Sequence, residues 1–105
     1  MTARERLPNR RASETFELTV AGICYTCTLS RYADGRLAEI FLTNYKSNSA
    51  ADVGARDAAI AFSFAVQHGA DPAAIRLALC CDSHGRPSGP LGAALDLLAE
   101  GGRGP

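Results

Sequence analysis

The sequence has no excess of either charge and no long hydrophobic run. Lys plus Arg and Asp plus Glu number 11 each among 105 residues, so the formal net charge is zero. Because proteins that bind nucleic acid usually carry a basic excess, this balance disfavours nucleic acid as a partner. No apolar stretch approaches the ~20 residues of a membrane span, which argues against a membrane protein. Residues 1–11 lack the apolar core of a signal peptide, so we expect a cytoplasmic protein with reduced thiols.

The sequence also lacks the motifs that commonly carry catalysis. It contains no nucleophile motif, no Gly-rich nucleotide-binding loop and no pattern of paired carboxylates. We therefore predict no catalytic residue and no cofactor.

The composition is that of an ordinary folded domain. Apolar residues make up 47% of the chain and charged residues 21%, which excludes a disordered chain. A chain of this length buries roughly two-thirds of its unfolded surface, so it can form a core without disulfides. We expect a flexible basic arm over residues 1–13, a single α+β domain over 14–100 and a disordered tail over 101–105.

Alternation of apolar and polar residues predicts a meander of three antiparallel strands. The patterns cover residues 15–20, 23–31 and 37–43. Asp34-Gly35 between the last two favours a tight hairpin, because Gly readily takes a positive φ. The outer edge of such a sheet needs a cover or a partner.

Three helices are predicted to follow, over residues 50–67, 72–80 and 91–100. Ser49 fits the N-cap of the first helix, with Asp52 as the reciprocal partner in a capping box. Gly69 fits its left-handed C-cap. Asp71 and Pro72 fit the N-cap and first position of the second helix. The second half of the first helix is apolar on nearly every side, which is typical of a buried central helix.

Two groups of cysteines are candidate redox or metal sites. Cys24 and Cys27 have C-x-x-C spacing, but residues three apart in a strand point to opposite faces, so we interpret both as small half-buried hydrophobic residues. Cys80, Cys81 and His84 offer two or three zinc ligands, whereas a structural site takes four. The alternative is a pair of helix-end thiols that pack on the core, with His84 in a solvated loop. We predict no metal site and keep this trio as the weaker metal hypothesis.

The loop before the last helix is a candidate anion site. Arg86, Ser88 and Gly89 precede a helix N-terminus, whose free N–H groups favour a phosphate or a nucleotide. The alternative is an ordinary loop in which Ser88 caps the helix.

Charged residues elsewhere are candidates for binding a partner. Arg6, Arg10 and Arg11 are suited to grip phosphates or an acidic protein; otherwise they form a solvated arm. Glu39 lies within a strand pattern and is a further candidate, although most strand acids lie on the solvated face.

Several segments occur in an order that resembles a known family. The most specific is Asp34-Gly-Arg-Leu-Ala-Glu-Ile-Phe-Leu42; the others are Arg6-Leu-Pro-Asn-Arg-Arg11, Thr15-Phe16, Tyr25-Thr26, Lys46-Ser-Asn-Ser49 and Phe64-Ala-Val-Gln-His-Gly69. Over residues 6–99 this order resembles the TSCPD domain, the C-terminal region of adenosylcobalamin-dependent (class II) ribonucleotide reductases, which also occurs as small stand-alone proteins.

The resemblance implies no catalytic residue for this chain. The Thr-Ser-Cys-Pro-Asp motif that names the family has no match here, since Ser88-Gly-Pro-Leu-Gly92 takes its place without the cysteine. In the family, the radical chemistry and the cobalamin surface belong to a separate catalytic barrel, so no role is carried over onto the cysteines.

Three functions remain open from the sequence. The first is a non-catalytic accessory or protein-interaction module in nucleotide metabolism, with a ribonucleotide reductase subunit or a second copy of the chain as partner. The second is a small-ligand or nucleotide-binding regulatory domain. The third is one part of a split ribonucleoside-diphosphate reductase, the activity that the resemblance would suggest for an enzyme.

Overall fold

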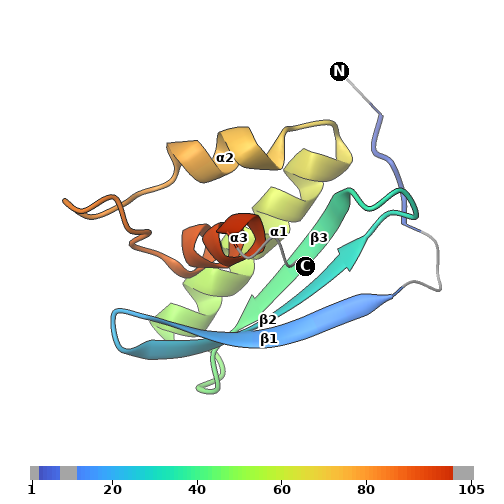
Figure 1. Ribbon diagram of the computed structural model, residues 1–105. Coiled ribbons are helices and arrows are strands. Elements are labelled where there is room, and N and C mark those ends of the chain that lie inside the picture. Colours follow the sequence, from blue (N-terminus) through green and yellow to red (C-terminus); the bar gives the residue numbers. More distant parts are fainter. Residues whose placement is uncertain (1–2, 8–11, 101–105) are drawn as a thin grey trace.

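A computed structural model describes residues 3–7 and 12–100 (Figure 1). Three strands precede three helices: β1 (Ser13–Val20), β2 (Ile23–Arg31), β3 (Leu37–Thr43), α1 (Ala50–Gln67), α2 (Pro72–Ala78) and α3 (Pro90–Glu100). The strands form one antiparallel sheet in the order β1-β2-β3, which confirms the predicted α+β meander. No helix in this described part of the chain is long and apolar enough to cross a membrane.

The observed boundaries differ from the sequence patterns at three element ends. β1 begins at Ser13 rather than at residue 15, because its first residues pair with the end of the long β2. α3 begins at Pro90 rather than at residue 91. α2 ends at Ala78 rather than at residue 80, because Leu79 is already extended (φ −75°, ψ 159°), and Cys80 therefore lies outside the helix.

One face of the sheet carries the core. Tyr25, Cys27 and Leu29 alternate along β2 and are buried on this face. The neighbouring strands add further buried residues: Leu18, Ala38, Ile40 and Leu42. The other face is rich in threonine; its hydroxyl groups include Thr15 Oγ1 and Thr28 Oγ1, which lie 3.1 Å apart.

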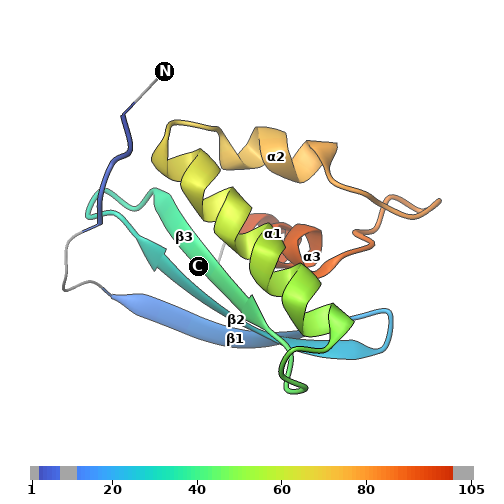
Figure 2. The ribbon, with the colours of Figure 1, turned by 180° about the vertical axis from the view of Figure 1, so that it is seen from behind.

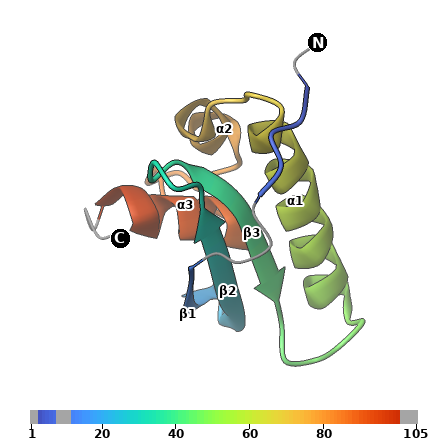
Figure 3. The same cartoon turned by 90° about the vertical axis from the view of Figure 1, so that its right-hand side faces the viewer.

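The helices cover the core face in two layers. α1 packs on β3, α3 packs on β1 and against α1, and α2 rests on α3 (Figures 1 and 3). Their contributions to the core come from Ala55, Ala59, Phe62 and Val66 of α1 and from Leu91, Ala94 and Leu95 of α3. None of the residues of α2 is buried, so this helix is the outermost layer.

The outward face of α1 corrects one expectation. The apolar second half of this helix predicts burial on all sides, yet Ile60 and Phe64 are each 49% exposed. The sheet and α3 cover only one side of the helix, and the described residues do not form another layer against the opposite side.

Both hairpin turns contain residues with positive φ. Ala21 and Gly22 between β1 and β2 both have positive φ, 52° and 78°, the pattern of a type I′ turn. Gly35 between β2 and β3 has φ 94°, as the Asp34-Gly35 pair predicts. Since a type I′ turn is closed by a hydrogen-bonded pair, Val20 and Ile23 are such a pair.

The start of α1 partly corrects the predicted capping box. Ser49 is the N-cap and its hydroxyl accepts the N–H of Asp52 at 3.2 Å, as expected. The Asp52 carboxylate does not return the bond to Ser49. It accepts the N–H groups of Asn44 (2.9 Å) and Asn48 (3.0 Å) and so ties the incoming loop to the helix.

Side chains of α1 occupy the outer edge of β3. Ser63 Oγ accepts the N–H of Ile40 at 2.9 Å and donates to its carbonyl at 3.1 Å. Gln67 Nε2 donates to the carbonyl of Ala38 at 2.9 Å. With Asp52 at the far end of the strand, these bonds satisfy backbone groups that an edge strand would otherwise expose.

The described residues of the N-terminal arm lie beside the β2–β3 hairpin and the end of α1 (Figure 2). The N–H of Glu5 donates to the carbonyl of Gln67 at 2.7 Å, and Tyr32 Oη donates to the carbonyl of Glu5 at 2.7 Å. Arg36 makes two hydrogen bonds of 3.0 Å to the Glu5 carboxylate. Arg4 lies over the ring of Phe64, 4.7 Å from its centroid.

Candidate functional site

The loop between α2 and α3 holds the predicted anion site, and it contains an anion of its own. The Asp82 carboxylate accepts the N–H groups of His84 (2.8 Å) and Arg86 (2.9 Å). The Arg86 guanidinium lies 3.8 Å from the same carboxylate. These N–H groups, that of Arg86 foremost, hold the pKa of Asp82 below its usual range. The guanidinium that suggested a phosphate therefore already lies beside an anion of the chain itself, Asp82.

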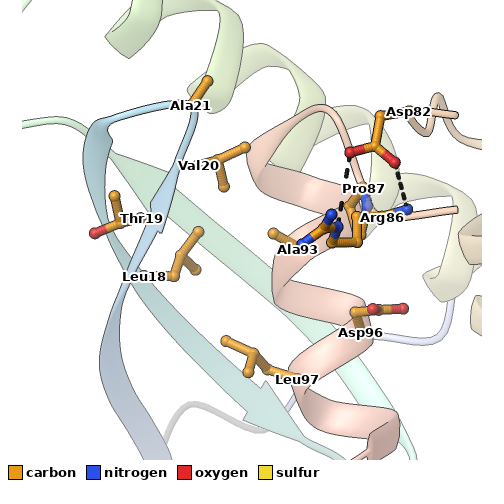
Figure 4. A pocket seen from close by; sticks show the side chains of 10 residues that line it. All are labelled: Leu18, Thr19, Val20, Ala21, Asp82, Arg86, Pro87, Ala93, Asp96 and Leu97. Atoms are coloured by element: carbon orange, nitrogen blue, oxygen red, sulfur yellow. Dashed lines mark hydrogen bonds and ion pairs between the residues drawn. The ribbon is translucent and has the colours of Figure 1, made fainter. Parts of the chain in front are cut away.

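Arg86 also borders a cavity of about 620 Å³ between this loop, α3 and the C-terminal end of β1 (Figure 4). Leu18 and Val20 point toward α3, while Thr19 points away from it. On the helix side, the lining includes Leu97 and the carboxylate of Asp96. The lining is thus mixed in character, and it does not concentrate positive charge.

The structure separates the three predicted anion ligands. Gly89 borders a different, largely apolar cavity of about 380 Å³ that includes Tyr25 and Leu79. Ser88 is exposed, and its N–H donates to the carbonyl of Cys80 at 3.0 Å. The residue directly before α3 is Gly89, whose carbonyl accepts the N–H of Ala93 at 3.1 Å. Arg86, Ser88 and Gly89 therefore do not converge on one point.

The cysteines do not gather either. Cys24 is exposed and Cys27 is fully buried. Their side chains therefore point to opposite faces of β2, as predicted, but the interpretation of both as half-buried residues is wrong. Burial raises the pKa of the Cys27 thiol to about 12. Cys80 and Cys81 are exposed beyond the end of α2 and do not pack on the core, contrary to the interpretation as buried helix-end thiols. Within residues 3–7 and 12–100, no three or more His, Cys, Asp or Glu side chains are placed to hold a metal ion.

The residues proposed for partner binding have different surroundings. Arg6 is exposed on the described part of the arm, whereas Arg10 and Arg11 lie outside the described residues. Glu39 is only 6% exposed, so a partner would meet little of its surface.

Two surface features escaped the sequence patterns. Arg76 of α2 and Asp96 of α3 form an ion pair of 2.9 Å that joins the two helices. Because the two residues are far apart in the sequence, no local pattern predicts this pair. Val53, Ile60 and Phe64 form an exposed apolar stripe along α1, which we call the α1 stripe. Its helical spacing is visible in the sequence, but the side that the sheet would leave open is not.

Together the fold and these sites define a small α+β protein with a neutralised loop and an exposed apolar helix face. Two curated relatives are similar to it. The chain is 38% identical over 66 residues to the vitamin B12-dependent ribonucleotide reductase of Agrobacterium fabrum, a match that covers 63% of this chain and 5% of that protein. It is 36% identical over 69 residues to the protein of the same name from Bradyrhizobium diazoefficiens. This match covers 66% of this chain and 6% of that protein.

These matches support homology between this chain and a region of ribonucleotide reductase. The matched stretch spans only a small part of each relative. No family model and no solved structure matches the sequence. The reductase part of the resemblance is thus confirmed, while the assignment to the TSCPD domain stays a prediction.

Proposed function

We propose that this chain is a non-catalytic interaction module that docks on a ribonucleotide reductase and corresponds to the C-terminal region of the vitamin B12-dependent enzymes. The observation that carries the proposal is the match to two relatives of that name. The homologous stretch amounts to 5% and 6% of their length. A docking role is the function that so small a part of a large enzyme supports best.

The α1 stripe is the surface best suited to docking. Val53, Ile60 and Phe64 are 42%, 49% and 49% exposed, and their spacing puts them on one side of the helix. Exposed apolar patches with polar surroundings mark protein-interaction sites. Arg56 and Asp57 on the same helix supply such surroundings.

Co-elution with the vitamin B12-dependent ribonucleotide reductase of the host tests the proposal. We expect the tagged chain to retain the reductase in a pull-down and to co-elute with it in size-exclusion chromatography. Ile60→Glu should reduce the retained reductase at least tenfold, because a charge in the stripe would be desolvated on docking. Ala61→Glu is the matched control, since Ala61 is exposed on the same helix but lies off the stripe.

Two results would contradict the proposal in different ways. If the wild-type chain never co-elutes with the reductase at micromolar concentrations, the docking role is wrong. If Ile60→Glu and Ala61→Glu both bind as well as the wild type does, docking uses another surface.

The small-ligand hypothesis has less support. Asp82 already accepts the N–H groups of His84 and Arg86 and lies beside the Arg86 guanidinium, so a nucleotide phosphate that binds this arginine would have to displace it. Calorimetric titration with ribonucleotides and deoxynucleotides should therefore give flat heats, and a saturable heat at micromolar ligand would restore the hypothesis.

A further inference from the structure

The two edges of the sheet differ in how their backbone groups are satisfied. At the β3 edge, Ser63 and Gln67 bind the groups of Ile40 and Ala38, as described above. At the β1 edge, the described residues supply no such bonds to the outward backbone groups. β1 is therefore the edge at which another strand can add.

The type I′ turn determines which residues of β1 face outward. Because Val20 and Ile23 are a hydrogen-bonded pair, Leu18 and Phe16 also direct their N–H and C=O groups toward β2. The alternate residues direct theirs away from the sheet, and these are Ser13, Thr15, Glu17 and Thr19.

β1 carries little of the protection that edge strands usually show. Ser13–Val20 contains no proline and no lysine, and its pairing with β2 runs without a bulge. On its helix side, the cavity of about 620 Å³ lies between Leu18 to Ala21 and α3. Among the residues whose backbone groups point away from the sheet, Glu17 is the one with a charged side chain. This charge limits which registers are possible.

We infer that the β1 edge binds the β1 edge of a second copy of this chain, antiparallel and with Phe16 on the two-fold axis. In this register Ser13 faces Thr19 of the other copy and Thr15 faces Glu17. Every residue of β1 whose backbone N–H and C=O groups point away from β2 then has a hydrogen-bonding partner in the other copy. Phe16, which is half-buried in the single chain, meets its own symmetry mate on the core side of the sheet, where a pair of aromatic rings is favourable.

The neighbouring registers are poorer. An axis at Glu17 puts two glutamates directly opposite each other, which is destabilising, and leaves Ser13 without a partner in β1. An axis at Thr15 leaves Thr19 without one. Glu14 on the core side faces Leu18 in the favoured register and keeps its own ion pair with Arg31 at 3.8 Å. The inference deepens the proposed function, on which it rests for treating the chain as an interaction module.

Sedimentation velocity of the full chain with a proline scan of the edge tests this arrangement. We expect a dimer for the wild type and a monomer for Thr15→Pro, because proline removes an N–H that points to the second copy and not to β2. Thr15→Val keeps this N–H and should remain dimeric. Far-ultraviolet circular dichroism of both variants should match that of the wild type. A wild-type chain that is monomeric up to millimolar concentration would overturn the inference, as would a dimer that Thr15→Pro leaves intact while its circular dichroism is unchanged.

Cross-linking in a background of Cys24→Ser, Cys80→Ser and Cys81→Ser tests the register. Phe16→Cys should form a disulfide dimer under mild oxidation, since facing residues of a non-hydrogen-bonded pair lie within disulfide range. Glu17→Cys is the matched control and should not cross-link, because it faces Thr15 of the other copy. Efficient cross-linking of Glu17→Cys with none of Phe16→Cys would overturn the register.

The two proposals can fail separately. A monomer that still co-elutes with the reductase removes the dimer and keeps the docking role. A dimer that never binds the reductase does the reverse. A third outcome is a monomeric wild-type chain that binds the reductase and loses this binding on Thr15→Pro. The β1 edge then binds a strand of the reductase, and the second copy is the wrong occupant.

Discussion

Asp52 and Asp82 are carboxylates that accept backbone N–H groups of their own chain. Asp82 closes the loop before α3, and Asp52 fixes the entry to α1. The sequence pattern suggested an external anion beside Arg86, and Asp82 occupies that place. The pattern also suggested that Asp52 accepts the N–H of Ser49, but Asp52 accepts the N–H groups of Asn44 and Asn48 instead. A sequence pattern identifies donors near an acid, but the path of the chain decides which donors the acid meets.

Asp52 should make stability depend on pH in the acid range. Hydrogen bonds from the N–H groups of Asn44 and then Asn48 lower its pKa from the usual 3.8. Because the folded pKa is lower than the unfolded one, the ionised carboxylate stabilises the fold above pH 3.8, and this contribution is lost as the pH falls through the folded pKa. Asp52→Asn should lower the thermal midpoint at pH 7 and flatten its fall below pH 4.

The control for that measurement is Asp57→Asn, an exposed residue on the same helix. Thermal scans across the acid range, on both sides of the usual Asp pKa of 3.8, should show the wild-type slope for this variant. Equal midpoints for Asp52→Asn and the wild type at pH 7 would show that the two N–H groups are satisfied without the carboxylate.

The four cysteines should separate by reactivity. Cys24, Cys80 and Cys81 are exposed, whereas Cys27 is 0% exposed and its pKa is raised to about 12 by burial. Since the thiolate is the reactive form, Cys27 should resist a thiol reagent at pH 8 until the protein unfolds. Titration with a disulfide reagent should detect three fast thiols in the native protein and a fourth in denaturant. Four fast thiols would show that the core around β2 opens readily.

Among the elements, α1 has two tasks: it covers the core face of the sheet and it occupies the edge of β3. Buried apolar positions carry out the first task, and Ser63 and Gln67 carry out the second. The apolar positions are readable as helical periodicity. The second task is not, because a serine or a glutamine in a helix usually faces water.

Ser63→Ala should destabilise the fold through β3. The substitution leaves the N–H and the C=O of Ile40 without a partner, and an unsatisfied buried backbone group costs about 1–3 kcal/mol. Urea unfolding should show a loss in this range, together with faster hydrogen exchange at the Ile40 amide. Ser83→Ala in the exposed loop is the control and should change the free energy of unfolding by less than about 0.5 kcal/mol. Unchanged exchange at Ile40 would mean that water replaces the hydroxyl.

The elements themselves were largely predictable from the sequence. Alternation located β2 and β3, and Asp34-Gly35 located the hairpin between them, because these signals are local. The ends of β1 and α2 were less predictable: β1 follows the length of its partner strand, and Leu79 leaves the helix to reach the loop. The candidate site was not predictable in the same way, since Asp82 neutralises Arg86 through a turn whose geometry no pattern specifies.

On the scale of the whole molecule, the chain should show no reductase turnover by itself. The relatives that carry the reductase name are about twenty times longer than the stretch that matches, as the 5% and 6% coverage implies. Incubation with a ribonucleotide, adenosylcobalamin and a dithiol should form no deoxyribonucleotide, while the full-length reductase of the host does so under the same conditions. Formation of deoxyribonucleotide by the purified chain would contradict the non-catalytic role.

The occupied edge of β3 also limits how large an assembly can grow. A sheet with two open edges can recruit strands on both sides, and identical chains then add without end, as in a fibre. Here the hydroxyl of Ser63 and the amide of Gln67 terminate one side, so strand addition is restricted to the other. Two copies joined through β1 leave a β3 edge at each end, and polymerisation stops there.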